Sequence, residues 1–440
     1  MKLRTLPLTL ALMAAFTGTA QAQSLATLYE AAKSHDATFK SARSQFEATL
    51  ARAEQAKALL RPTAGLGGNL SETDLDNQSN ALGSRAFGTR ALTFSASHPL
   101  YRPANQASYE QGMKQVALAQ AQLKVAEQEL IMRLSQAYFD VLTAQESLNF
   151  VKAEKSSVSE QLAAAKRKFE VGTTTITDTR EAQAKFDRVT AEEIAAENDL
   201  RIKKLALDDT VGQREVSPKP LLGAVNMDGL QSGSIESWVA QSVQDNGNLA
   251  QARIALEVAQ LEITKAQAAL RPTLDLTGSY GMTRYNYHQG RTALQPNTNA
   301  ATIGLAFNYP LYTGQASQNR IKETVALEDK AKNDLEAAQR SVVHATRTAF
   351  LGLQSGLSQV KAWQAAEASS QSTLDANKLG YQVGFGTNIE VLNSQSLLFQ
   401  TKRDLAKARY NVLLGQMKLR QAAGVLKVED VQNISNLLQN

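Results

Sequence analysis

The stretch Leu60-Arg61-Pro62-Thr63 decides the fold, because it returns as Leu270-Arg271-Pro272-Thr273. Further landmarks recur in the same order: PLY at 99–101 and 310–312, VG at 171–172 and 383–384, and glycine at 212 and 424. An offset of about 211 residues with conserved order and spacing indicates an internal duplication. Because this period is far too long for a solenoid, each copy is a whole unit of several elements.

The amino-terminal residues predict export. Lys2 and Arg4 precede an apolar run at 6–16, and Ala20-Gln21-Ala22 offers small residues to a signal peptidase, so we expect a signal peptide at 1–22. A buried amino-terminal helix is the alternative. The chain has no cysteine, which excludes disulfides, thiol chemistry and a lipid anchor at the cleavage site. Removal of Lys2 and Arg4 with the signal peptide lowers the formal net charge from +5 to +3. Because this charge is small and evenly spread along the chain, we expect no nucleic-acid partner.

The centre of each copy predicts a very long helix. The 58 residues from Met113 to Glu170 contain neither Gly nor Pro, and their apolar residues follow a helical stripe. A helix at about 104–170 would be roughly 100 Å long and is expected to form a coiled-coil rod. Shorter helices are expected at about 36–60 and 176–211, and together they would match its length. The second copy repeats this pattern at about 248–270, 315–382 and 388–423.

Four short stretches instead show the period of two that is typical of strands. They lie at 63–71 and 90–97 in the first copy, and at about 273–282 and 302–309 in the second. No later stretch has 18 consecutive apolar residues, so entry into a membrane would require strands. Four strands cannot close a barrel in lipid, but three chains together would supply twelve strands. A soluble hairpin packed on the helices is the alternative.

These patterns predict the domain organisation. We expect a signal peptide at 1–22, a first repeat at 23–212 with a hairpin at about 63–98, a linker at 213–234, a second repeat at 235–426 with a hairpin at about 273–309, and a C-terminal tail at 427–440.

The duplicated unit resembles the TolC family of outer-membrane exit ducts. The resemblance rests on LRP before each hairpin, PLY after it, and FEVG at 169–172 with YQVG at 381–384. It implies a mainly α fold with transmembrane β structure, in which a homotrimer forms a twelve-stranded β-barrel continuous with a periplasmic α-helical barrel. It also implies passive export, by type I secretion of proteins or efflux of small molecules. The implied partners are a periplasmic adaptor, an inner-membrane ABC or proton-driven transporter, and outer-membrane lipid.

The resemblance also places a pore constriction at the turns 171–178 and 383–390. Asp178 and Glu390 match acidic positions after each VG, although TxxD and TxxE are equally typical of helix capping boxes. Tyr381 matches the tyrosine that helps to close the constriction. Gly386 stands where the family pattern has an arginine, and Asn393 where it has an acid. The familiar arginine–carboxylate lock therefore cannot form there; Arg180 is a possible substitute.

Other classes of function find little support in the sequence. There is no GxxxxGK[ST] motif, and the four histidines lack metal-ligand spacing, so we expect no enzyme, no cofactor and no metal site. The remaining alternative is an exported, non-conducting trimeric coiled coil with a structural or adhesive role. It would explain the rods but not the duplicated hairpins.

Overall fold

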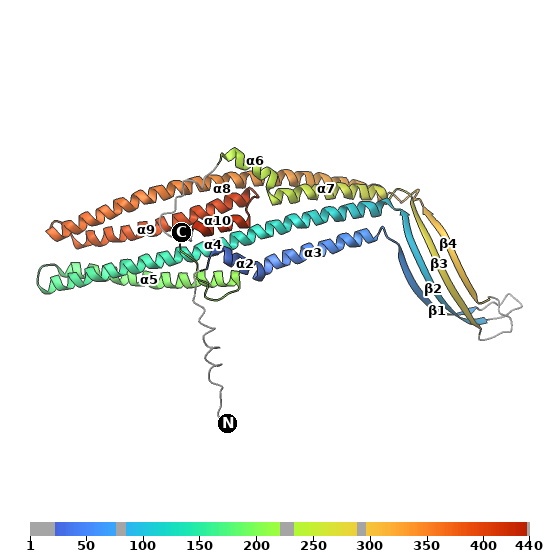
Figure 1. Ribbon diagram of the computed structural model, residues 1–440, viewed down its shortest axis with the longest axis horizontal. Coiled ribbons are helices and arrows are strands. Elements are labelled where there is room, and N and C mark those ends of the chain that lie inside the picture. Colours follow the sequence, from blue (N-terminus) through green and yellow to red (C-terminus); the bar gives the residue numbers. More distant parts are fainter. Residues whose placement is uncertain (1–22, 76–84, 221–232, 288–295, 438–440) are drawn as a thin grey trace, which may run out of the picture. The chain divides into compact units, whose positions relative to one another are not determined.

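The computed structural model describes residues 23–75, 85–220, 233–287 and 296–437 (Figure 1). The predicted signal peptide at 1–22 lies outside them, as do parts of the hairpin loops, of the linker and of the C-terminal end. The described elements are, in order, α2 (Leu25–His35), α3 (Ala37–Ala58), β1 (Thr63–Leu75), β2 (Arg85–Tyr101), α4 (Pro103–Glu170), α5 (Ile176–Val211), α6 (Ile235–Asp245), α7 (Gly247–Ala268), β3 (Thr273–Tyr287), β4 (Thr298–Asn308), α8 (Ala316–Val383), α9 (Asn388–Ala422) and α10 (Val428–Leu437). Two copies of one six-element pattern thus precede α10.

The long helices end where the sequence places their breaks. Both α4 and α8 have 68 residues and lie within one residue of the predicted bounds. Gly172 and Gly384, with φ of 74° and 90°, adopt the left-handed conformation just beyond these helices, as helix-terminating glycines commonly do. The mainly helical, duplicated architecture is therefore confirmed.

Each copy also begins with a short helix that the sequence analysis missed. Asp36 follows α2, and its Oδ1 accepts the Phe39 backbone N–H at 2.6 Å at the start of α3. Asn246 follows α6, and its Oδ1 accepts the N–H groups of Asn248 and Leu249 at 2.9 and 3.2 Å. Each of these side chains thus caps the second helix of a pair, as Asx residues do. Helix α10 lies within the predicted C-terminal tail.

The chain forms two compact units. The helical unit comprises the residues up to Arg43, Leu123–Leu249 and those from Gln339 on; the sheet unit comprises Ser44–Gln122 and Ala250–Ala338. In the helical unit a buried core joins α2, α4 and α5 of the first copy to α9 and α10, and its largest side chains include Tyr29, Tyr138 and Phe139. Helices of both copies therefore contribute to a common buried cluster.

The repeated glycines Gly212 and Gly424 end α5 and α9 in equivalent surroundings. Their φ values are 73° and 76°, which favour glycine. A Cβ on Gly212 would lie 2.2 Å from the His35 ring, and one on Gly424 would lie 2.3 Å from the Asp245 carbonyl oxygen. Each glycine thus lets the last helix of its copy approach the end of the first helix.

The sheet unit contains one antiparallel sheet in the order β1-β2-β3-β4, so the two predicted hairpins pair through β2 and β3 (Figure 1). The first three strands have 13, 17 and 15 residues and exceed the expected lengths. Strand β2 continues through PLY to Tyr101, with a register irregularity between Pro99 and Tyr101. Pro99–Tyr101 therefore belongs to the strand, whereas Pro310–Tyr312 follows the end of β4.

Candidate functional site

The first candidate site is the turn between α4 and α5. Thr175 caps α5: its hydroxyl accepts the Asp178 N–H at 3.2 Å, while Asp178 Oδ2 accepts the Thr175 N–H at 3.2 Å. The hydroxyl groups of Thr174 and Thr175 also donate to Asp178 Oδ2. The Thr174 bond is the main cause that lowers the pKa of Asp178, and the positive charge of Lys168 adds to it, against the opposing effect of burial. Asp178 is therefore a firmly ionised, half-buried cap.

The equivalent turn between α8 and α9 has the same capping box. Glu390 Oε2 accepts the Thr387 N–H at 3.0 Å, and the Thr387 hydroxyl accepts the Glu390 N–H at 3.4 Å. Glu390 is exposed, and Asn393, one turn further along α9, is exposed as well. The capping role that the TxxD and TxxE patterns predict is thus present in both copies. A position of these acids in a pore remains a prediction.

A lysine that the sequence analysis did not single out joins the two turns. The ammonium of Lys168, in the last turn of α4, lies 4.0 Å from the centre of the Tyr381 ring at the end of α8. This is a cation–π contact of good geometry. Tyr381 also packs against the buried Leu374, Val391 and Leu398 of α8 and α9, which fix the ring in place. In the described part of the chain, Tyr381 makes its polar contact with Lys168 and not with Asp178.

Gly386 fits closely into the second turn. Its N–H donates to the Gly380 carbonyl at 3.1 Å. A Cβ there would lie 3.0 Å from the Tyr381 backbone N and 3.2 Å from the Gly380 carbonyl carbon. These are backbone atoms, so an arginine could enter this position only if the turn moved. Arg180 is exposed on α5 and has no hydrogen bond or ion pair with the residues described, so it provides no substitute within the chain.

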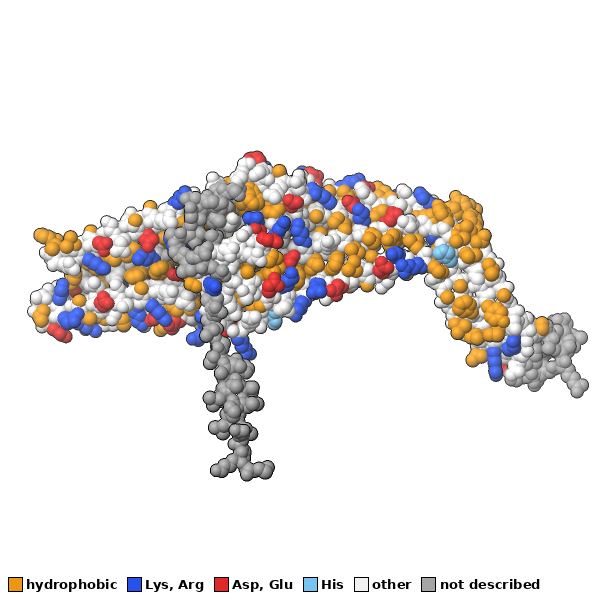
Figure 2. All heavy atoms as spheres, viewed as in Figure 1, with side chains coloured by type: hydrophobic (Ala, Val, Ile, Leu, Met, Phe, Trp, Pro, Cys, Tyr) orange, Lys and Arg blue, Asp and Glu red, His pale blue; other side chains and the backbone are white. Residues whose placement is uncertain are grey.

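The second candidate site is the sheet, whose two faces differ in chemistry. The register aligns Leu66 with Phe94, Phe94 with Tyr280, and Leu276 with Leu305 on one face. These side chains are 40–70% exposed, and Ile303 on the same face is 85% exposed. Figure 2 shows hydrophobic side chains gathered over the strands. A contiguous exposed apolar surface of this kind marks an interaction site.

The opposite face carries small and polar residues. Gly65, Ser95, Ser279 and Thr302 are aligned across all four strands. At the base of this face, Arg102 forms a bidentate ion pair with Asp275, at 2.7 and 2.5 Å. Within the described chain, β1 and β4 each pair on one side only. Their other edges are therefore available to further strands.

No group of three or more His, Asp or Glu residues with the geometry of a metal site occurs among the described residues. The described helices include none that is both long enough and apolar enough to cross a membrane.

Comparison with known proteins gives consistent matches over nearly the whole chain. A family model described as "Outer membrane efflux protein" matches residues 28–213 and 238–425, one segment in each copy. The outer membrane protein TolC of Vibrio cholerae is 32% identical over 417 residues, which cover 94% of this chain and 93% of that protein. The proteases secretion protein PrtF of Dickeya chrysanthemi is 27% identical over 436 residues, covering 96% and 93%. The crystal structure of the outer membrane protein VceC of Vibrio cholerae has the same fold, with a TM-score of 0.77 at 20% identity, and the match covers 91% of this chain and 96% of that one.

Proposed function

Because this chain belongs to the outer membrane efflux protein family, we propose that its turns at 171–178 and 383–390 form the constriction of an export duct. The chain is a trimeric outer-membrane exit duct for efflux and type I secretion, with a large periplasmic part. It works with a periplasmic adaptor and an inner-membrane transporter. Its relatives are export channels, so it is a channel protein and not an enzyme, and the non-conducting coiled coil loses its support.

The apolar face of the sheet is proposed to contact the lipid of the outer membrane. One face is apolar and exposed while the other is small and polar, which is the alternation of a membrane-spanning strand that faces lipid on one side and a lumen on the other. In a trimer, β1 of one chain would pair with β4 of the next, so that no edge remains open. The net charge of +3 expected after processing offers no basis for binding nucleic acid.

Two arginines extend this proposal to the lipid headgroups. Arg90 and Arg284 are exposed, directly opposite in the register and on the apolar face, towards the loop ends of β2 and β3. Like charges in direct opposition destabilise a strand pair, and an anion held between the two guanidinium groups would offset this repulsion. A phosphorylated headgroup would supply that anion. Substitution of both by glutamine should reduce the phospholipid retained in native mass spectrometry; unchanged retention would count against the headgroup contact.

The proposed constriction is acidic. Asp178 and Glu390 lie in equivalent turns, so two acids from each of three chains would surround the narrow end. A ring of carboxylates favours cations and resists anions. The observation that carries this proposal is the pairing of the two turns through Lys168 and Tyr381 at 4.0 Å, which places both at one end of the helical unit.

Planar-bilayer recording of the purified trimer tests the proposal. Asp178→Asn with Glu390→Gln removes both charges but keeps an oxygen that can accept the capping bond. We expect cation selectivity to fall, and the melting temperature to fall only slightly because the two charged caps become neutral. Glu197→Gln with Asp199→Asn, on an exposed part of α5, is the matched control and should leave selectivity unchanged. If the wild type, this variant and the control have equal selectivity, Asp178 and Glu390 act only as helix caps.

A further inference from the structure

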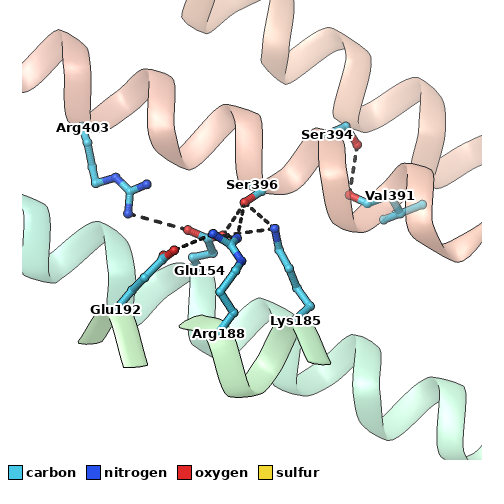
Figure 3. A network of polar contacts seen from close by, with 8 residues as sticks. All are labelled: Glu154, Lys185, Arg188, Glu192, Val391, Ser394, Ser396 and Arg403. Atoms are coloured by element: carbon cyan, nitrogen blue, oxygen red, sulfur yellow. Dashed lines mark hydrogen bonds and ion pairs between the residues drawn. The ribbon is translucent and has the colours of Figure 1, made fainter. Parts of the chain in front are cut away.

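A buried carboxylate lies where the two copies meet in the helical unit. Figure 3 shows Glu154 of α4 surrounded by Lys185 and Arg188 of α5 and by Ser396 and Arg403 of α9. The Glu154 side chain is 0% exposed. Helices α4 and α5 belong to the first copy and α9 to the second, so this group of residues, the Glu154 cluster, connects the copies.

Ser396 is the central bridge of the Glu154 cluster. Its hydroxyl donates to Glu154 Oε1 at 2.7 Å and accepts from Lys185 Nζ at 2.6 Å and from an Arg188 guanidinium nitrogen at 3.0 Å. Lys185 and Arg188 lie 3.9 and 3.6 Å from the same carboxylate oxygen. One small side chain from α9 thus completes a site whose other groups come mainly from the first copy.

The cluster is only partly satisfied. Glu154 Oε2 has no hydrogen bond among the described residues, and its nearest ion-pair partner, Arg403 of α9, is 3.9 Å away. Burial lowers the pKa of Lys185, and the neighbouring Arg188 adds to this effect, as expected for a cation taken out of water. A buried charge is stable only while its partners remain in place. If α9 moved away, Glu154 would lose its hydroxyl donor and Arg403, but water could then solvate it. The contact is therefore specific and can also be released.

The cluster lies close to the proposed constriction along the same helices. Lys185 follows Asp178 by seven residues, and Ser396 follows Glu390 by six, which corresponds to roughly 9–11 Å along each helix. Contact of α9 with α4 and α5 at this level therefore limits how far the two turns can separate. The Lys168–Tyr381 contact acts at the turns themselves.

We propose that Glu154 and Ser396 form a releasable clasp that holds α9 against α4 and α5 and so keeps the constriction narrow. The inference rests on the proposed function, because it assigns regulation to the same duct. Opening requires α9 to leave the cluster, and closing requires the Ser396 hydroxyl to return between the carboxylate and the two cations.

Ser396→Ala tests the clasp, with Ser394→Ala as its matched control. Ser394 is two residues away on α9, but among the described residues its hydroxyl donates to carbonyls of its own helix, that of Val391 (Figure 3) and that of Glu390. We expect Ser396→Ala to raise the ratio of open to closed time in bilayer recordings roughly tenfold, because a buried bond to a charged group is lost. Ser394→Ala should match the wild type. If the wild type conducts but both substitutions change the open-to-closed ratio equally, the clasp is overturned and the proposed function is not. A wild type without current would overturn the proposed function and the clasp with it.

A covalent version separates the clasp from a general loss of stability. The chain has no native cysteine, so Arg188→Cys with Ser396→Cys offers a single pair of thiols. Before cross-linking this protein should be open at least as often as Ser396→Ala, because it also lacks the Arg188 cation 3.6 Å from Glu154. A thiol-cleavable reagent about as long as the lost arginine side chain should lower the resting current, and its cleavage should restore it. A resting current that stays the same before and after cross-linking would overturn the proposal.

Discussion

Replacing Lys168 with glutamine should open the narrow end of the duct. The substitution keeps an unbranched polar side chain, one atom shorter, but removes the charge 4.0 Å from the centre of the Tyr381 ring. Cation–π contacts contribute about 0.5–1 kcal/mol when exposed and about 2 when desolvated. Lys168 is half-buried, so about 1 kcal/mol per chain is a fair value. If the Lys168–Tyr381 contact breaks in all three chains together, the closed state loses about 3 kcal/mol of stability, which corresponds to roughly a 150-fold change in the open-to-closed ratio. If the contact breaks independently in each chain, the open-to-closed ratio should change about fivefold.

Single-channel recordings with matched variants distinguish this contact from other effects of charge. Lys166→Gln removes a charge from an exposed position on the same helix and should behave as the wild type. Lys168→Arg keeps a cation and should stay closed. Tyr381→Phe keeps the ring and should also stay closed, whereas Tyr381→Leu should open. If Tyr381→Phe opened as widely as Tyr381→Leu, the hydroxyl and not the ring would hold the turn, and the reasoning would be refuted.

Three further predictions concern stability. Gly386→Ala should destabilise the second turn by about 1–3 kcal/mol, because its Cβ would lie 3.0 Å from the Tyr381 N, and amide exchange in that turn should become faster. Asp178 has a lowered pKa, so its stabilising effect is complete above its ordinary value of 3.8 and is lost as the pH falls through the folded value. The melting-temperature advantage of the wild type over Asp178→Asn should therefore be constant from about pH 7 to 5 and shrink below about pH 4. Gly424→Ala should lower the melting temperature more than Gly314→Ala, because both glycines have positive φ but only Gly424 lacks space for a Cβ.

Much of the fold could be predicted because the sequence marks the ends of its helices. Thr175 and Thr387 initiate α5 and α9 with capping boxes, and the VG pairs end α4 and α8. Short helices were harder to predict. Asp36 caps α3 and also follows the end of α2, so a helix that starts at this position conceals the one before it.

The strands were underestimated because their outer ends do not look like strands. Glu72 and Asp74 of β1 continue the ladder with Gly88 and Ala86, although acidic residues and glycine are typical of loops. Pairing in a sheet depends on the partner strand, which lies elsewhere in the sequence. Local composition therefore sets only a lower limit on strand length.

The capping acids of the candidate site were predictable from the TxxD and TxxE patterns, but its cation was not. Lys168 is one of several basic residues near the end of α4, where cations generally complement the helix dipole. Only the folded chain shows that this lysine meets Tyr381, more than 200 positions later. The sequence shows Gly386 at the position where the family resemblance implies an arginine, but it does not show the contact that joins the two turns.

The polar face of the sheet has a consequence for cargo. Where it lines the proposed passage, a molecule leaving the cell meets hydroxyl groups and bare backbone, such as those of Ser95, Thr302 and Gly65. The Arg102–Asp275 pair at its base neutralises its own charges. Such a wall offers little for an aromatic drug or an unfolded polypeptide to adhere to. Cargoes of very different chemistry can then pass through the same duct, and the transporter and adaptor that deliver the cargo determine which molecules are exported.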